Sequence, residues 1–88
     1  MSARRLKLVY FAWVRERVGQ PEEEVDLPEG VDTVADLVRW LKSRGEEYDY
    51  AFENDGVVRA AVDHTHVKPE TSLAGAREVA FFPPMTGG

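Results

Sequence analysis

The segment TVADLVRWLKSR, residues 33–44, carries the strongest structural signal in the sequence. Its apolar residues recur with the i, i+3, i+4, i+7 spacing of an amphipathic helix: Val34, Leu37, Val38 and Leu41. Thr33 with Asp36 three residues later forms a weak capping box at the start, and Gly45 is a suitable stop. The spacing therefore predicts the main helix of the domain over residues 33–44.

Segments of alternating polarity on both sides of this helix predict a β-sheet. We expect strands over residues 5–11, 22–27, 57–62, 66–68 and 77–82. Residues 12–18 predict a short helix that ends at Gly19, whereas residues 46–52 fit either a short helix or an irregular packed segment. This order predicts an α+β domain in which one main helix packs on one face of a mixed sheet.

The alternation also predicts which strand residues face the helix. On that side we expect Leu6, Leu8, Tyr10, Val79 and Phe81. The same alternation directs Phe11 and Phe82 to the opposite face, where they would form an exposed aromatic pair. Exposed aromatic residues of this kind are typical of a surface that binds a partner.

Composition limits the class of protein. The chain has 88 residues, enough for one small domain, and its net charge of −5 disfavours binding to the phosphates of nucleic acids. The absence of cysteine excludes disulfides and a cysteine nucleophile. The N-terminal region lacks the cleavage site of a signal peptide, and nothing in the sequence approaches a membrane span. We therefore expect a cytoplasmic protein whose partners include neither nucleic acid nor a membrane.

Side chains that could carry chemistry are scattered. His64 and His66 lie two residues apart, but no further ligands have the spacing of a metal site. No serine lies in a nucleophile motif, and no glycine-rich phosphate-binding loop is present. We therefore expect no metal site, no bound cofactor and no active site formed by this chain alone.

The last six residues are the exception. A single domain over residues 1–82 passes directly into Pro-Pro-Met-Thr-Gly-Gly, residues 83–88. The two prolines end the last predicted strand and keep the chain extended, and the two glycines present backbone alone. Such a tail suits insertion into a narrow channel of another protein, with the Gly88 carboxylate at its tip.

A carboxylate in that position needs activation before it can carry sulfur. Adenylation by ATP on a separate enzyme would convert Gly88 into a reactive acyl-adenylate. Attack by a sulfur donor would then leave a thiocarboxylate, which is a nucleophile at neutral pH. A protein without cysteine could carry sulfur on this one terminal atom.

The C-terminal sequence VAFFPPMTGG, residues 79–88, resembles that of the small-subunit family of molybdopterin synthase, the MoaD family. The segments FAWVRE (11–16), Thr33–Leu41 and AAVD (60–63) are similar to the same family, so the resemblance covers nearly the whole chain. It implies a ubiquitin-like β-grasp fold. His66 departs from the aliphatic residue expected at its position, and Met85-Thr86 departs from the usual small aliphatic residues.

The resemblance also implies partners and roles. Gly88 would be adenylated by a relative of the ubiquitin-activating enzymes and converted to a thiocarboxylate with a separate sulfur donor. The tail would enter the large synthase subunit in a heterotetramer and pass sulfur to a cyclic pyranopterin phosphate, forming the molybdopterin dithiolene. The residues implied to bind partners are Phe11, Phe82, Pro83, Pro84, Met85, Thr86 and Gly87.

Two other interpretations fit the residues. β-grasp proteins that end in Gly-Gly also donate sulfur for thiazole synthesis or tRNA thiolation, or become conjugated to lysines through the terminal glycine, here Gly88. Alternatively, the chain is an interaction domain with an unmodified tail, because a fold by itself does not define a function. Tolerance of a residue added after Gly88 would distinguish this last interpretation from the others.

Overall fold

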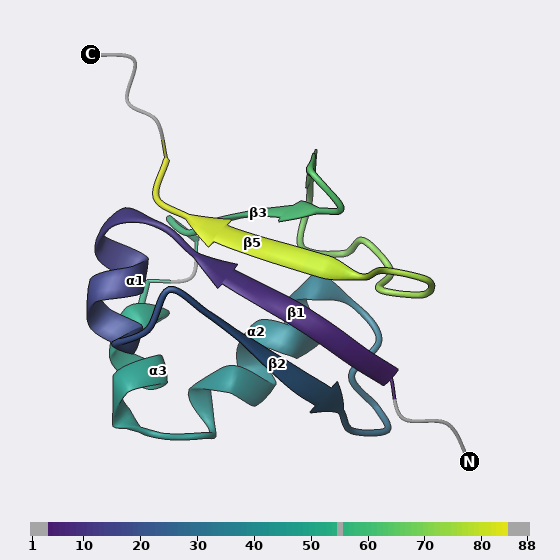
Figure 1. The fold of residues 1–88 in the computed structure, drawn as a ribbon, viewed down its shortest axis with the longest axis horizontal. Helices are drawn as coiled ribbons and strands as arrows, with labels where there is room; N and C mark the ends of the chain where they lie inside the picture. The colour runs from purple at the N-terminus through teal and green to yellow at the C-terminus, as the bar shows by residue number, and fades with distance from the viewer. Residues whose placement is uncertain (1–3, 55, 85–88) are drawn as a thin grey trace.

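The structure, a computed structural model, describes residues 4–54 and 56–84. Five strands form one mixed sheet in the order β2-β1-β5-β3-β4. The strands are β1 (Arg4–Tyr10), β2 (Glu22–Leu27), β3 (Arg59–Val62), β4 (Thr65–Val67) and β5 (Glu78–Phe82). The helices are α1 (Ala12–Val18), α2 (Val34–Lys42) and α3 (Glu46–Ala51). In Figure 1 the sheet lies toward the viewer, and α2 and α3 lie behind it.

The pairing places the two ends of the chain side by side. β1 and β5 are parallel neighbours, with Tyr10 opposite Phe81. β1 pairs antiparallel with β2, and β5 pairs antiparallel with β3. The last strand of the chain therefore occupies the centre of the sheet. Figure 1 shows β5 between β1 and β3, with its arrow ending beside α1.

The main helix forms as its sequence predicts. Thr33 accepts a hydrogen bond from the Asp36 backbone N–H at 3.1 Å, and the Asp36 carboxylate accepts one from the Thr33 N–H at 3.2 Å. The carbonyl groups of Pro69 and Thr71 accept the first free N–H groups of α2, those of Ala35 and Val34. The segment after β4 thus ties the start of α2 to the sheet.

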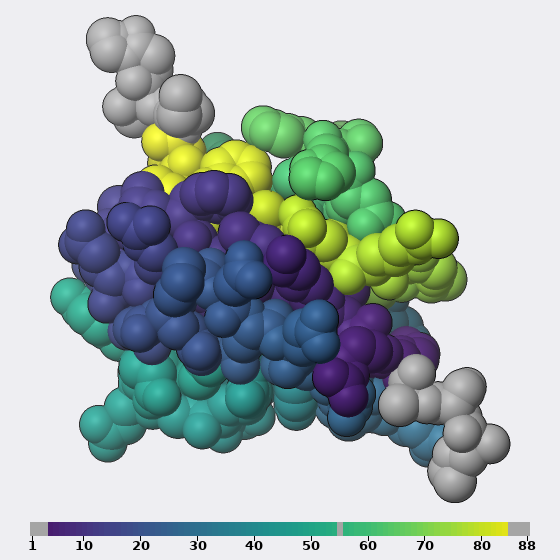
Figure 2. Space-filling view, in the orientation of Figure 1, coloured from purple at the N-terminus to yellow at the C-terminus, as the bar shows by residue number. Residues whose placement is uncertain are grey.

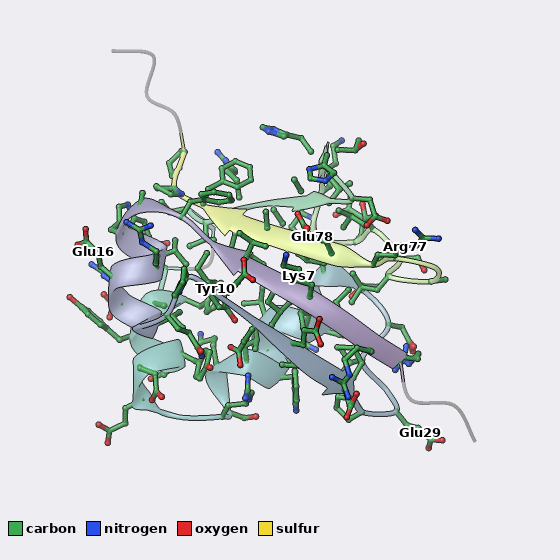
Figure 3. All side chains as sticks on the ribbon, viewed as in Figure 1. Lys7, Tyr10, Glu16, Glu29, Arg77 and Glu78 are labelled. Atoms are coloured by element: carbon green, nitrogen blue, oxygen red, sulfur yellow. The ribbon has the colours of Figure 1, made fainter. Side chains whose placement is uncertain are left out.

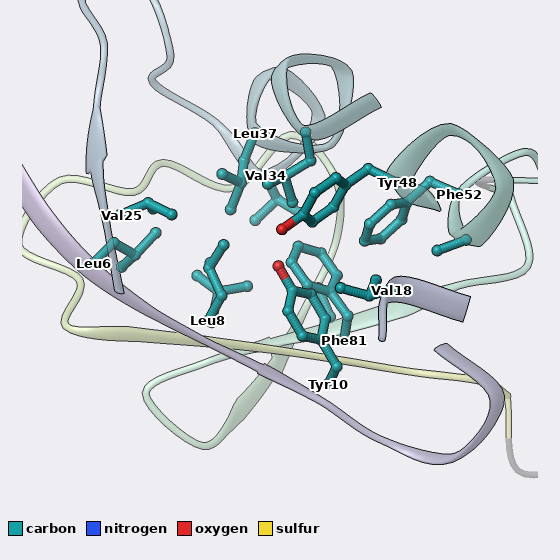
Figure 4. Packing of buried hydrophobic residues seen from close by; sticks show 14 of the residues in the cluster. Leu6, Leu8, Tyr10, Val18, Val25, Val34, Leu37, Tyr48, Phe52 and Phe81 are labelled. Carbon is teal, nitrogen blue, oxygen red and sulfur yellow. The ribbon is translucent and has the colours of Figure 1, made fainter. Parts of the chain in front are cut away.

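Apolar side chains from the sheet and from the helices meet in one core, shown in Figure 4. The sheet contributes Leu6, Leu8, Tyr10, Val79 and Phe81, each no more than 1% exposed, as the alternation predicts. α2 contributes Leu37 and Leu41, and α3 contributes Tyr48 and Ala51. The ring of Phe52 meets that of Phe81 edge to face at 5.0 Å between centroids. Phe81 thus joins the central strand to the helical layer.

One polar cluster closes the edge of this core. Glu23 accepts hydrogen bonds from the hydroxyl groups of Tyr10 at 2.9 Å and Tyr48 at 2.6 Å. Arg44 pairs with the other oxygen of Glu23 at 3.1 Å, and the Gln20 amide donates to the Tyr48 oxygen at 3.0 Å. In Figure 4 the two tyrosine hydroxyl groups point toward each other. The cluster joins β1, β2 and α3 while satisfying the polar atoms of two buried rings.

Several element boundaries differ from the predicted ones. The main helix ends at Lys42 rather than at residue 44, and the third strand begins at Arg59 because the Val57 N–H is used in a turn with the Asn54 carbonyl. The fourth strand covers Thr65–Val67, one residue earlier than predicted. Residues 46–51, which were ambiguous in sequence, form α3. Within the described ranges, no helix is long and apolar enough to cross a membrane.

The facing of β5 generates a stability prediction. Phe81→Ala should lower the free energy of unfolding by about 3–5 kcal/mol, because it leaves a cavity beside Tyr10 and Phe52. Phe82→Ala is the matched control on the other face and should cost less than about 2 kcal/mol, since Phe82 is only half-buried. Urea denaturation of both variants measures the difference, and equal losses would contradict the observed facing.

The tyrosine cluster generates a pH prediction. Burial and the adjacent Glu23 carboxylate raise the pKa of Tyr10 above its ordinary value of 10.0. The folded chain therefore keeps the phenol neutral at a pH where the unfolded chain loses the proton. The contribution of the neutral Tyr10 phenol to the free energy of unfolding should be fully present below pH 10. It should decrease as the pH rises above 10, by up to roughly 1.4 kcal/mol per pH unit.

Tyr10→Phe tests this pH dependence. The variant should show a shallower decrease in the free energy of unfolding above pH 10, whatever its stability at pH 7. Tyr50→Phe is the control, because Tyr50 is 51% exposed. Urea titrations at several pH values between 8 and 11 would provide the slopes. A Tyr10→Phe slope equal to that of the unmodified chain would show that this phenol is not responsible.

Candidate functional site: the open sheet face and the root of the tail

The end of β5 fixes the point at which the tail leaves the domain. On one side, the Phe11 N–H donates to the Phe81 carbonyl at 3.0 Å. On the other side, Phe82 pairs in register with Arg59 of β3. Pro83 comes next and has no N–H to donate, so the hydrogen-bonded ladder stops there. The tail therefore starts from the middle of the sheet, at a position held by strands on both sides.

The face of the sheet away from α2 carries a row of small apolar side chains near this root. Val9 of β1 lies opposite Ala80 of β5, and Ala80 lies opposite Ala61 of β3. His66 of β4 continues the row, opposite Ala61. Figure 2 shows this face uncovered by helices, with β5 in yellow between the purple of β1 and the green of the β3–β4 region. The row forms an apolar floor, in which Ala61 is only 7% and Ala80 only 9% exposed.

Two aromatic residues lie at the tail end of this floor. The parallel register that places Tyr10 beside Phe81 brings Phe11 beside Phe82 on the next step. Phe11 is 48% exposed, whereas Phe82 is half-buried and its ring lies beside that of His66, with 5.0 Å between ring centroids. We call the set that contains both rings and the floor the apolar patch: Val9, Phe11, Ala61, His66, Ala80 and Phe82.

Backbone geometry at the end of β1 keeps Phe11 on this face. Phe11 itself is extended, with φ −125° and ψ 153°, so it continues the alternation of β1. Ala12 then adopts φ 53°, a left-handed conformation that costs a non-glycine residue roughly 1–2 kcal/mol. The sharp turn at Ala12 directs the chain into α1 and leaves the Phe11 ring outside the core.

The other half of the same face is charged. Arg5 pairs with Asp26 at 2.8 Å and with Glu24 at 3.1 Å, and Lys7 lies 3.7 Å from Glu22. The hydrogen bond with Glu24 and the charge of Asp26 raise the pKa of Arg5. Figure 3 labels Lys7 on β1 and Glu78 on β5, which lie opposite each other in the parallel register. Exposed pairs of this kind add little stability, but they divide the face into a charged half and an apolar half beside the tail.

The structure brings together some of the residues that the sequence predicted for the site. Phe11 and Phe82 share one face, and Pro83 and Pro84 follow directly. The expectation of an exposed aromatic pair is wrong for Phe82, whose ring is half-buried beside that of His66. The remaining predicted residues lie outside the described ranges: Met85, Thr86, Gly87 and Gly88. The partner-binding role predicted for Phe11, Phe82 and residues 83–87 therefore stays a prediction. The chemical role of Gly88 also stays a prediction.

Sequence reasoning missed the small residues of the patch. Val9, Ala61 and Ala80 gave no functional signal, because alanine and valine are common in any strand. Their positions between core-facing neighbours in the predicted strands could have assigned them to the open face. His66 was considered as a metal ligand with His64 and noted as a departure from an expected aliphatic residue, but not as a neighbour of Phe82; in the structure the two rings lie 5.0 Å apart between centroids.

The described residues contain no cluster of three or more side chains that could hold a metal ion. His64 lies 4.0 Å from Glu78, at the turn between β3 and β4, and His66 lies against Phe82. The two histidines thus contact different groups. What the described part of this site offers chemically is an apolar surface beside an anchored tail.

A mixed five-stranded sheet with this order, a main helix across one face and a tail leaving the central strand define a ubiquitin-like β-grasp domain. Comparison with known proteins assigns it further. Residues 8–88 match the ThiS family model. The chain belongs to the ThiS family.

Individual relatives agree with this assignment. The chain is 41% identical over 85 residues to the molybdopterin synthase sulfur carrier subunit of Escherichia coli, covering 94% of this chain and 99% of that protein. Among solved structures, it resembles a putative molybdopterin converting factor subunit 1 from Pyrococcus furiosus, with a TM-score of 0.69, 32% identity, and coverage of 91% and 97%. It also resembles SAMP1 of Haloferax volcanii, with a TM-score of 0.69, 25% identity, and coverage of 96% and 99%.

Proposed function

We propose that this chain is a sulfur carrier for molybdopterin synthesis and that it carries the sulfur as a thiocarboxylate on Gly88. The observation that supports this most strongly is the 41% identity with the Escherichia coli sulfur carrier subunit over nearly the full length of both chains. The position of the tail root at the centre of a rigid sheet fits the same function, because the carrier must deliver one terminal atom to a defined place in a partner.

The proposed activation proceeds in two steps on a separate adenylating enzyme. First, a Gly88 carboxylate oxygen attacks the α-phosphorus of ATP, and pyrophosphate leaves. Next, a sulfide nucleophile from the donor attacks the Gly88 carbonyl carbon, the carbon–sulfur bond forms, and AMP leaves with the former carboxylate oxygen. The product is the thiocarboxylate. ATP is thus a substrate of the partner, and this chain needs no cofactor of its own.

The proposed delivery takes place in the large subunit of molybdopterin synthase. The thiocarboxylate sulfur attacks a carbon of the cyclic pyranopterin phosphate and displaces an oxygen substituent, whose bond to that carbon breaks. Water then cleaves the bond between that sulfur and the Gly88 carbonyl. The carboxylate of Gly88 is restored for another cycle, and a second delivery completes the dithiolene. Catalytic side chains come from the large subunit, and we place the cycle in the cytoplasm.

The apolar patch is the proposed docking surface for both partners. It lies at the root of the tail, so a partner that covers Phe11 and Phe82 also receives residues 83–88, a length of chain that could reach roughly 20 Å if fully extended. Phe11 and Phe82 place aromatic rings on an apolar floor, and aromatic side chains are often among the residues that contribute most to the binding energy of an interface. The ion pairs of the charged half would lie at the rim.

A second function is supported by the likeness to SAMP1 of Haloferax volcanii, because another solved structure of that organism is titled small archaeal modifier protein 1. In that case the activated Gly88 carbonyl would be attacked by a lysine amine of a target protein, with AMP or a carrier thiol leaving. Lysine-linked adducts in cells expressing the tagged chain would support this route, and their absence would leave sulfur delivery.

The main test is the mass of the C-terminus. Incubation of the full chain with the adenylating partner, ATP and a sulfide donor should replace one oxygen by sulfur at Gly88, because the acyl-adenylate is open to sulfur attack. Intact-mass spectrometry with C-terminal peptide mapping measures the exchange. No exchange under conditions in which the Escherichia coli relative is converted would contradict the proposal.

Matched variants sharpen this test. Deletion of Gly88 and addition of one alanine after Gly88 should each abolish the exchange and the formation of molybdopterin, while thermal unfolding stays unchanged. If the extended chain supports molybdopterin formation as well as the unmodified one, the chain acts as an interaction domain with an unmodified tail, and the sulfur-carrier proposal is wrong.

The docking surface yields a separate prediction. Phe11→Ala should weaken binding to the large subunit at least tenfold, since an anchor residue of an interface typically contributes more than about 1.4 kcal/mol. Its folding stability should change little, because the ring is 48% exposed. Tyr50→Ala is the control: Tyr50 is 51% exposed but lies on α3, away from the patch. Calorimetric titration measures both affinities, and equal effects of the two variants would remove the docking role from Phe11.

A further inference from the structure

A cavity of about 490 Å³ lies between α2 and the β3–β4 side of the sheet. Its walls are mainly apolar and come from α2, β3, β4, β5 and the segment before β3: Val34, Val38, Val58, Ala60, Val67 and Phe81. This volume is within the usual range of small-molecule sites, which is about 300–1,000 Å³. The cavity lies on the helix side of the sheet, so it is separate from the apolar patch and from the tail root.

Within residues 4–54 and 56–84, the charged residues that line this cavity are cationic. Arg39 and Lys42 line it from α2, three residues apart and therefore on the same side of the helix, and Arg59 lines it from β3. Among the described residues that line it, none is acidic.

Lys42 is the cation best suited to meet a ligand. Arg39 is paired with Asp36 at 3.0 Å, which offsets its charge. Arg59 precedes Ala60, whose side chain faces the core, so strand alternation directs the Arg59 side chain toward the open face. Lys42 is half-buried and has no ion-pair partner within residues 4–54 and 56–84. Its aliphatic stem can cover apolar wall while the ammonium group stays at the mouth.

Apolar walls with one lysine at the mouth favour a particular chemical class of ligand. A nucleotide or another polyanion would leave its polar groups unpaired against valine and phenylalanine walls, which is costly. A neutral hydrocarbon would gain nothing from Lys42. We propose that the cavity binds a small amphipathic anion, with an aliphatic body against the apolar walls and a single carboxylate at Lys42. The cavity is on the other side of the sheet from the apolar patch, so such a ligand would not compete with docking there.

The test is a titration of the full isotopically labelled chain, followed by the backbone amide signals in two-dimensional NMR. The probes share one chain length and differ in charge: octanoate, octan-1-ol and octylammonium. Octanoate should shift the amide signals of Val38, Ala60 and Val67 with saturable binding, octan-1-ol should bind more weakly at the same place, and octylammonium should not bind. Equal affinities for the three probes, or shifts confined to the apolar patch, would overturn the proposal.

Three variants locate the ligand. Lys42→Gln should weaken octanoate binding about fivefold and leave octan-1-ol unchanged, because it removes only the ion pair. Ala35→Leu adds an aliphatic side chain on the α2 wall and should block both probes. Arg15→Gln, on α1 and away from the cavity, is the control and should change neither. Thermal unfolding confirms that each variant is folded.

Unchanged octanoate affinity in folded Lys42→Gln would overturn the proposal. The same titration on a chain lacking Gly88 should give the octanoate affinity of the full chain, since the cavity does not involve the tail. The outcome is therefore independent of whether Gly88 carries sulfur.

Discussion

The placement of the last strand at the centre of the sheet is the constraint on which the rest of this structure depends. β5 is hydrogen-bonded to β1 on one side and to β3 on the other, and Phe81 joins it to the helical layer through the ring of Phe52. A terminal strand at an edge could fray without disturbing the sheet. Here the strand that ends in the tail is also the strand that organises the core, so the root of the tail is as rigid as the fold.

The alternation of β5 assigns opposite roles to adjacent residues. Phe81 is 1% exposed and packs with Tyr10, whereas Phe82 lies on the open face beside Phe11. One residue step therefore separates the side chain that stabilises the domain from the side chain proposed to bind partners. A shift of one residue in the β1–β5 register would exchange these roles, and the parallel pairing prevents that shift by fixing Tyr10 opposite Phe81.

The fold was predictable where the signals were local. The spacing of Val34, Leu37 and Leu41 gave the main helix, and the alternation of β1 and β5 gave the correct core side. The spacing of residues could not give the β1–β5 register or the Glu23 cluster, because residues distant in the sequence form them. Likewise, Phe11 and Phe82 were predicted for the site, but the floor of Val9, Ala61 and Ala80 was not, since it depends on the register across three strands.

The two faces of the sheet therefore offer different surfaces for binding. On the open face, the floor is made of small residues, and Phe11 stands out because Ala12 accepts a strained backbone conformation. On the helix side, Phe81 packs against Tyr10 and Phe52 and also lines the cavity beside α2, which Lys42 borders. Both surfaces rest on the same central strand. A ligand of the cavity would contact Phe81, which is adjacent to Phe82, and through that strand the two surfaces share one rigid support.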